Sequence, residues 1–322
     1  MMISRTITVV LLVLAAGCRP APRSDSTEND GGDAKSYLIS PAPAASVPSS
    51  GDIEGTPGTE AARDEALQTQ LEKVRLQMGS GFRSAIVGPF VVTGDLPAEQ
   101  FEKISRTTIA WAVETLTKDF FAEEPAEVIT IYLFDGKESY RKHAWSLFSD
   151  RPSTPYGYYS AQHRALVMNI ATGTGTLVHE MVHPYMRADF PLAPSWFDEG
   201  LASLFEQCRQ REGHIVGLLN WRLPVLKRGL QSGKLVALEE LLATSTEEFY
   251  EDPDGMHYAE ARYLCYYLQE KQLLRPFYRE FKSNQKVDPT GRETLLVVTG
   301  KNSLKELQDE WLEFLAPLNF VR

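Results

Sequence analysis

Two histidines four residues apart, in an otherwise apolar stretch, place the tightest constraint on how this chain folds. Residues 179–183 read His-Glu-Met-Val-His. Side chains four positions apart lie on one face of an α-helix, so His179 and His183 can reach a single cation if this segment is helical. Imidazole nitrogen is a common ligand of zinc. The spacing therefore predicts a helix over about 175–187 that carries two ligands of a zinc ion.

Glu180 stands beside the face that the two histidines share. Its carboxylate could take a proton from a metal-bound water, whose pKa zinc lowers to about 7, which makes Glu180 the candidate general base. The opposite side of the helix is expected to pack on the core through Leu177, Val178, Met181 and Val182. The alternative is a pair of surface histidines on an amphipathic helix, because three matching positions also occur by chance.

A second helix, expected over 195–210, offers a third metal ligand. Ser195 suits the N-cap, and Asp198 stands at the position where it would complete a capping box, which gives it a structural role. Glu199 projects away from the apolar stripe of this helix and has small neighbours, so its carboxylate can approach a metal. The alternative for Glu199 is a solvated helix carboxylate.

At these residues the chain resembles the gluzincin metallopeptidases, in particular the bacterial group called peptidase MA-like. The family pattern is HExxH, a short connection and then Trp-x-x-Glu-Gly-x-Ala. Residues 179–183 match the first part and Trp196–Ala202 match the second. The resemblance covers roughly residues 86–318 and is strongest at 177–206.

The resemblance implies an α+β, thermolysin-like zincin fold, with a sheet lobe over the motif helix and a mainly helical lobe closing a cleft. It implies peptide-bond hydrolysis with one Zn²⁺ per chain, held by His179, His183 and Glu199. It also implies that an edge strand just before the motif helix, expected at Ala165–Ile170, binds the substrate backbone by strand addition.

The resemblance further implies a hydrogen-bond donor from the helical lobe that stabilises the oxyanion of the transition state. Tyr258 is the candidate, because it matches a Tyr-Ala position of the family at the start of a helix. Tyr258 could instead pack with Arg262 at the helix start, and His257 is the second candidate donor.

Three observations bear on rival patterns. Pro184 follows the second histidine directly, so we expect the helix to kink or end near His183. A metzincin would place its third ligand at Asp189, but Met186 occupies the glycine position at which that pattern turns the chain. A third ligand at Asp198 is disfavoured by its expected capping role.

The first 18 residues are expected to be a signal peptide. Arg5 is followed by an apolar run over 7–16, which is too short to span a membrane. The segment Leu14–Cys18 resembles a bacterial lipobox, although Ala15 stands where leucine is usual. This predicts an exported protein of the bacterial cell envelope, anchored to a membrane by a lipid on Cys18. The alternative is a plain secretory signal with an incidental cysteine.

The remaining chain is expected to hold a tether and one domain. Residues 19–62 are rich in Pro, Ser, Ala, Gly and Asp, which predicts disorder because little surface can be buried. The domain, 63–322, should comprise a helix at 63–78, a sheet lobe at about 86–170, the motif helix and a helical lobe at about 195–322. The first helix should pack on its own domain, although it could pair with another chain.

Within the domain, the periodicity of apolar residues predicts the individual elements. Strands are expected at 90–92, 128–134, 156–159 and 165–170. Helices are expected at 97–121, 137–148, 175–187, 195–210, 218–230, 236–243, 256–271, 273–283 and 302–316. The long helix at 97–121 should turn inward the residues Phe101, Ile104, Thr108, Trp111, Thr115 and Leu116.

The amino-acid composition indicates which classes of binding partner to expect. The formal net charge is −10 and no cluster of Lys and Arg occurs, which argues against nucleic acid. The expected partners are a peptide or protein substrate and a membrane. Cys208 and Cys265 are both expected on apolar helix faces, as two separate thiols rather than a disulfide, which export would permit.

A different class of function stays open at this point. The chain could be a non-catalytic binding or scaffolding protein of the envelope, with a structural or vestigial zinc site. Glu180 speaks against this reading, because a structural site needs no base, and no fourth protein ligand is evident.

Overall fold

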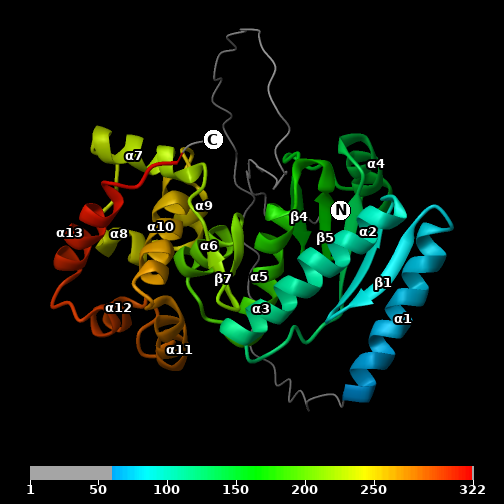
Figure 1. The fold of residues 1–322 in the computed structure, drawn as a ribbon, viewed down its shortest axis with the longest axis horizontal. Coiled ribbons are helices and arrows are strands. Elements are labelled where there is room, and N and C mark those ends of the chain that lie inside the picture. Colours follow the sequence, from blue (N-terminus) through cyan, green and yellow to red (C-terminus); the bar gives the residue numbers. More distant parts are fainter. Residues whose placement is uncertain (1–59, 321–322) are drawn as a thin grey trace, which may run out of the picture.

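The computed structural model describes residues 60–320 and contains a mixed five-stranded sheet. Its strands run in the order β1-β2-β3-β5-β4 (Figure 1). The outer pairs β1–β2 and β4–β5 are antiparallel, and the inner pairs β2–β3 and β3–β5 are parallel. The bounds of the strands are β1 Arg83–Val87, β2 Phe90–Gly94, β3 Ile129–Phe134, β4 Gly157–Ser160 and β5 Ala165–Asn169.

Helices cover both faces of this sheet. The helices α1 (Glu60–Met78) and α4 (Lys137–Phe148) pack on one face. The helix α5 (Gly175–Asp189) packs on the other face, in the main hydrophobic core. Every residue of β2, β3 and β5 is buried, which explains why these strands are almost continuously apolar.

The predicted long helix is observed, and Phe101, Ile104, Thr115 and Leu116 are buried as predicted, but the buried positions between them lie one residue later than predicted. It comprises α2 (Ala98–Ile104), a π-helical segment at Ser105–Ala110 and α3 (Trp111–Asp119). A π turn takes one more residue than an α turn, so the next inward side chain comes one position late. For this reason Ile109 and Ala112 are fully buried, whereas Thr108 and Trp111, which were predicted inward, are only half-buried.

The motif helix α5 follows β5 after one 3₁₀ turn, Ile170–Thr172. Of the two effects expected from Pro184, a kink or an end near His183, the end is wrong, because the helix continues through Pro184 to Asp189, close to the predicted bounds of 175–187. Nearly the whole helix is buried, and packing on both sides holds it in helical form despite the hydrogen bond that proline cannot make. The helix therefore keeps both histidines on one face.

The second half of the domain is mainly helical and lies beside the sheet half, with α5 and α6 between them (Figure 1). The helix α10 crosses α6 where Gly200 meets Ala261, and a Cβ at Gly200 would lie 2.9 Å from the Ala261 carbonyl oxygen. The helices of this half are α6 Ser195–Leu204, α7 Arg222–Ser232, α8 Leu238–Ala243, α9 Thr246–Tyr250, α10 Met256–Glu270, α11 Leu274–Asn284, α12 Arg292–Thr299 and α13 Leu304–Leu315.

Several sequence predictions need correction here. The helix predicted at 195–210 stops at Leu204, and a hairpin of β6 (Cys208–Arg211) and β7 (His214–Gly217) follows it. The strand at 165–170 is not an edge strand, because β5 lies between β3 and β4, so β4 forms that edge of the sheet. The strand β1 and the helices α9 and α12 were not predicted.

The cysteine prediction is partly right. Cys265 is buried in α10, but Cys208 begins β6 rather than lying on a helix. These two described residues do not form a disulfide.

The N-terminal predictions lie mostly outside the described residues. The signal peptide 1–18, Cys18 and the tether up to residue 59 are not described, while residues 60–62, predicted as tether, already belong to α1. The helix α1 packs on its own domain through Leu67, Leu71 and Val74, as predicted. Within the described part of the chain, none of the helices combines the length and apolar character that a membrane crossing requires.

Candidate metal centre

The two histidines of α5 point their Nε2 atoms at one another. Their Nε2 atoms are 3.2 Å apart, and both rings are buried. This follows from the four-residue spacing on a continuous helix. Leu177 and Met181, on the opposite side of α5, are fully buried in the core and fix the helix in place.

The helix α6 brings Glu199 to the same point. Its Oε2 atom lies 3.3 Å from Nε2 of His179 and 3.8 Å from Nε2 of His183, and the side chain is fully buried. The next residue, Gly200, has no side chain to keep α10 away from α6. This close approach of α10 covers α6 at the turn that carries Glu199.

The three ligand atoms fit a metal ion in number, chemistry and spacing. Within the described residues, His179, His183 and Glu199 form one group that could hold a metal. A circle through atoms with the observed separations has a radius of about 2.0 Å, close to the roughly 2.0–2.2 Å that zinc keeps from nitrogen and carboxylate oxygen. The Oε2 atom of Glu199 is buried and has no hydrogen-bond donor among the described residues. A buried carboxylate oxygen normally has a partner, and a bound cation would supply one.

The charge around the centre also favours a cation. Burial alone would lower the pKa of His179, but Glu199 and Glu206 raise it to about 10. The Glu199 carboxylate supplies negative charge at the point where the Nε2 atoms meet, and Glu206 supplies it on the Nδ1 side of His179. A divalent ion at the point where the Nε2 atoms meet balances this negative charge.

Each histidine presents its Nδ1 atom to a further carboxylate. Nδ1 of His183 lies 2.9 Å from Oδ1 of Asp198. Nδ1 of His179 lies 3.4 Å from Oε1 of Glu206, an ion-pair distance without the alignment of a full hydrogen bond. Such partners fix the ring orientation and make Nε2 a better metal ligand.

The contact of Asp198 corrects the capping prediction. Pro194 precedes the first residue of α6, and no side chain caps this helix. The Ser195 hydroxyl donates to Thr246 instead, and Asp198 faces His183. The capping box requires Ser195 at the N-cap, the position before the first helical residue. In the structure Pro194 is the N-cap and Ser195 is the first helical residue, so the box cannot form.

Glu206 is held in place by two neighbours that the sequence did not indicate. Arg222 donates to both of its carboxylate oxygens, at 2.7 and 3.1 Å, and Asn220 donates to one of them at 3.2 Å. Burial alone would raise the pKa of Glu206, but Arg222 and His179 lower it to about 2. Glu206 therefore presents a fixed negative charge to His179.

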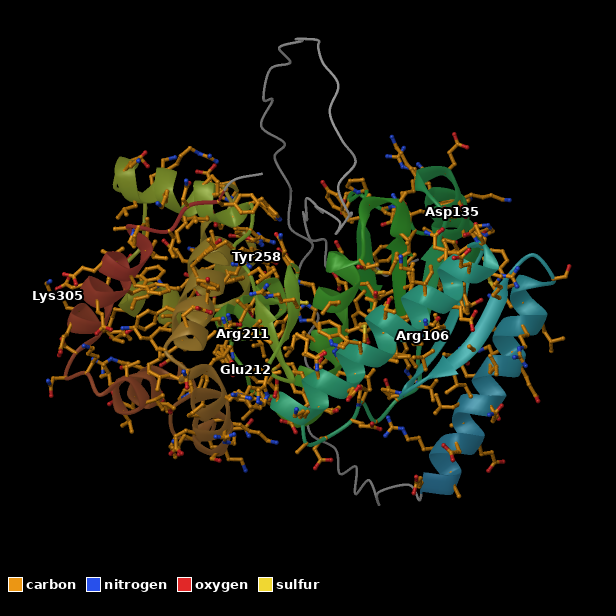
Figure 2. All side chains as sticks on the ribbon, viewed as in Figure 1. Arg106, Asp135, Arg211, Glu212, Tyr258 and Lys305 are labelled. Atoms are coloured by element: carbon orange, nitrogen blue, oxygen red, sulfur yellow. The ribbon has the colours of Figure 1, made fainter. Side chains whose placement is uncertain are left out.

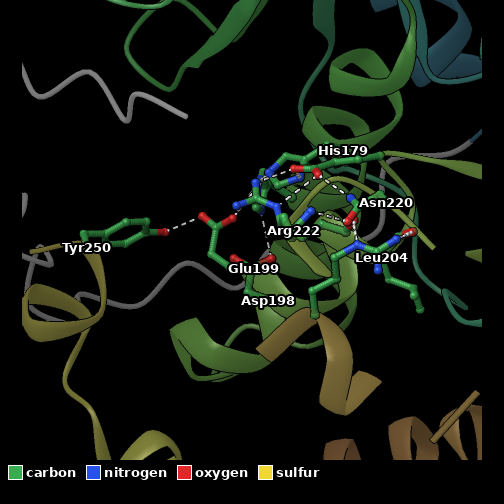
Figure 3. A network of polar contacts seen from close by, with 11 residues as sticks. His179, Asp198, Glu199, Leu204, Asn220, Arg222 and Tyr250 are labelled. Atoms are coloured by element: carbon green, nitrogen blue, oxygen red, sulfur yellow. Dashed lines mark hydrogen bonds and ion pairs between the residues drawn. The ribbon is translucent and has the colours of Figure 1, made fainter. Parts of the chain in front are cut away.

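Glu199 is oriented by a residue of α9. The Tyr250 hydroxyl donates to Oε1 of Glu199 at 2.7 Å (Figure 3). This hydrogen bond occupies the oxygen that does not face the histidines and leaves Oε2 for the metal. Tyr250 was not singled out from the sequence, because α9 itself was not predicted.

Glu180 lies on α5 next to His179 and is buried. Burial raises the pKa of its carboxyl, and the neighbouring charges of His179 and His183 oppose this shift. Its carboxylate makes no hydrogen bond or ion pair with a described residue, and its side chain is 2% exposed.

Tyr258 and His257 differ in their suitability as donors. The Tyr258 ring lies 6.3 Å from the ring of Tyr250, whose hydroxyl donates to Glu199, so Tyr258 stands beside the centre. Burial and the charge of Glu199 hold the pKa of Tyr258 well above its usual range, although Arg222 opposes this shift. Figure 2 shows Tyr258 toward the sheet half of the molecule. His257 instead stacks on Phe249 and places Nδ1 3.4 Å from the carbonyl oxygen of that residue.

The rival third ligand, Asp189, has other partners. Its carboxylate accepts the backbone N–H groups of Ala122 and Glu123 and the hydroxyl of Tyr278, and it pairs with Lys282. It does not belong to the metal-binding group.

The structure thus brings together His179, Glu180, His183 and Glu199, and adds Asp198, Glu206, Arg222 and Tyr250 around them. Tyr258 lies beside Tyr250 and Arg222. Comparison of the chain with models of known protein families finds no matching family. Comparison with curated protein sequences likewise finds no match.

Proposed function

We propose that this chain is a zinc-dependent peptidase that hydrolyses peptide bonds with Glu180 as general base. The observation that carries the proposal is the buried triangle of two imidazole nitrogens and one carboxylate oxygen, separated by 3.2–3.8 Å, with Glu180 beside it. Two histidines and one carboxylate are a typical catalytic zinc set, because the fourth position stays open.

Zinc is the metal that this ligand set favours. Magnesium and calcium prefer an all-oxygen shell, whereas imidazole suits zinc and other transition metals. His179, His183 and Glu199 would hold the ion. Bound zinc supplies a Lewis acid that acidifies a water molecule and polarises the scissile carbonyl.

The chain's own residues supply the remaining chemistry. The Glu180 carboxylate takes a proton from water as the water oxygen bonds to the carbonyl carbon, and returns it to the amine nitrogen as the carbon–nitrogen bond breaks. The Tyr258 hydroxyl donates a hydrogen bond to the carbonyl oxygen while negative charge develops there.

The proposed fold family is the thermolysin-like zincin fold, with substrate bound along the sheet edge. The edge strand β4 is unpaired on its outer side among the described residues. Tyr156, directly before β4, packs against Tyr258, which supports a substrate path along this edge. An extended peptide added to β4 would therefore run past the metal-binding residues.

The test is hydrolysis of a denatured protein mixture by the purified chain, with and without a chelator. The proposal predicts chelator-sensitive cleavage that zinc restores. Glu180→Gln should lose a factor of about 10²–10⁴ in rate while it keeps its zinc, since a general base contributes about that much. Equal cleavage by the variant would remove Glu180 from its role. A protein that binds zinc but cleaves nothing would support a binding or scaffolding function instead.

We also propose that the enzyme works in the bacterial cell envelope, anchored by a lipid on Cys18. The short apolar run and the lipobox-like Leu14–Cys18 support this. Cys18→Ser should move the protein out of the membrane fraction or leave its signal peptide uncleaved. Unchanged mature mass and fractionation would indicate a plain secreted protein.

A further inference from the structure

Arg222 contacts two parts of the site that act on different steps. It is the first residue of α7 and its side chain is 4% exposed. The edge of its guanidinium binds Glu206 through two hydrogen bonds, and Glu206 faces Nδ1 of the metal-ligand histidine His179. Its central carbon also lies 5.1 Å from the centre of the Tyr258 ring.

We propose that Arg222 is a positioning residue that holds His179, through Glu206, and the Tyr258 ring in the arrangement that metal binding and transition-state stabilisation require. The Tyr258 half of this inference rests on the proposed function. The His179 half concerns metal binding alone.

The planar shape of arginine is what allows both contacts. The guanidinium edge matches the two oxygens of a carboxylate, while its face attracts aromatic rings. Arg222 uses both at once, since it also lies 4.3 Å from the centre of the Trp221 ring. Lysine would place a positive charge here but could neither bind both oxygens in this geometry nor stack.

The turn before α7 fixes Arg222 in this position. Asn220 accepts the backbone N–H of Arg222 at 3.0 Å through its side chain, and the same side chain donates to Glu206. The backbone N–H of Asn220 in turn donates to the Tyr263 hydroxyl of α10 at 3.1 Å. The arginine is therefore tied to the helix that also carries Tyr258.

A buried ion pair could serve stability alone, so the experiment must separate the two roles. The full chain is compared with Arg222→Met, Arg222→Lys and Glu206→Gln. Arg275→Met serves as the matched control, because it removes an arginine from another buried carboxylate, Asp119, without touching the metal-centre residues. The readouts are the zinc dissociation constant, by competition with a chromogenic chelator, and the melting temperature.

Arg222→Met and Glu206→Gln should each weaken zinc binding about 10–100-fold, as expected on losing a partner of a metal-ligand histidine. The zinc dissociation constant of the double variant should not exceed that of the single variant with the larger effect, since both substitutions act through His179. Arg222→Lys should not restore the affinity. Zinc affinity in Arg222→Met or Arg222→Lys that stays within the range of the Arg275→Met control would overturn the inference.

The Tyr258 half is tested at saturating zinc. Arg222→Met should lower kcat with little change in KM, and this fall should largely disappear in the Tyr258→Phe background. If the chain cleaves no peptide, the proposed function fails, while the zinc measurements still decide the His179 half. A crystal structure of Arg222→Met then decides the other half: a displaced Tyr258 ring supports it and an unmoved ring contradicts it.

Discussion

Replacing Asp198 should weaken zinc binding, because its carboxylate faces Nδ1 of His183 at 2.9 Å. The expected size can be worked out in two ways. A hydrogen bond to a charged group contributes about 1.5–3 kcal/mol. Loss of a partner of a metal-ligand histidine costs about 10–100-fold in affinity, or about 1.4–2.7 kcal/mol. The two ranges agree, although Asp198 is 27% exposed and water will screen part of the effect.

We therefore expect Asp198→Asn to raise the zinc dissociation constant about tenfold, because the amide oxygen can still accept from His183. Asp198→Ala should approach the upper end of the range. Both are measured by competition with a chelator, with Asp309→Ala as the control, since Asp309 pairs with Lys305 on the surface. If both Asp198 variants bind zinc as tightly as the control, the carboxylate does not support the centre.

Three further predictions follow from single residues. Tyr258→Phe should keep its zinc and lower kcat at least about tenfold with little change in KM, and unaltered kcat would remove its hydroxyl from the mechanism. Burial raises the pKa of Glu260 to about 8 from 4.5, so stability should fall as pH rises between these values. In urea unfolding, Glu260→Gln should reduce that slope and raise the free energy of unfolding by about 3 kcal/mol at pH 7, whereas an unchanged slope would refute this pKa. Gly200→Ala puts a Cβ 2.9 Å from the Ala261 oxygen, so it should cost about 1–3 kcal/mol in thermal unfolding and reduce zinc content by shifting Glu199, and a wild-type melting temperature would contradict this.

Local patterns explain what could be predicted from the sequence. The helix of His179 and His183 and the strands around residues 156–170 depend on spacings of two to four residues, which are visible in the chain. The bounds of α4 match the prediction of 137–148. The ligand group His179, His183 and Glu199 follows from two such helices placed in contact.

The β6–β7 hairpin and the π-helical segment differ from the predicted elements because their sequences carry little periodic signal. The strand β6 reads Cys-Arg-Gln-Arg and shows no alternation of apolar residues. The hairpin has one available signal: Glu212 and Gly213 both adopt positive φ, the conformation that a tight two-residue turn requires and that glycine favours. The π-helical segment at 105–110 has no sequence signal that periodicity detects. Because of it, residues 109 and 112 are buried instead of the predicted residues 108 and 111.

The groups around the metal ligands could not be predicted, because they depend on contacts distant in the sequence. Glu206 and Arg222 are 16 residues apart, and Tyr250 is 51 residues from Glu199. Asp198 was assigned to a cap because local spacing suits one, whereas tertiary packing turned it toward His183.

The zinc content of the purified full chain tests the central claim most directly. Elemental analysis after zinc-supplemented purification should find about one zinc per chain in the wild type and in Glu180→Gln, because three ligands remain in both. His179→Ala and His183→Ala should contain almost none. A wild-type protein without zinc, or histidine variants that retain it at the wild-type level, would contradict the metal centre.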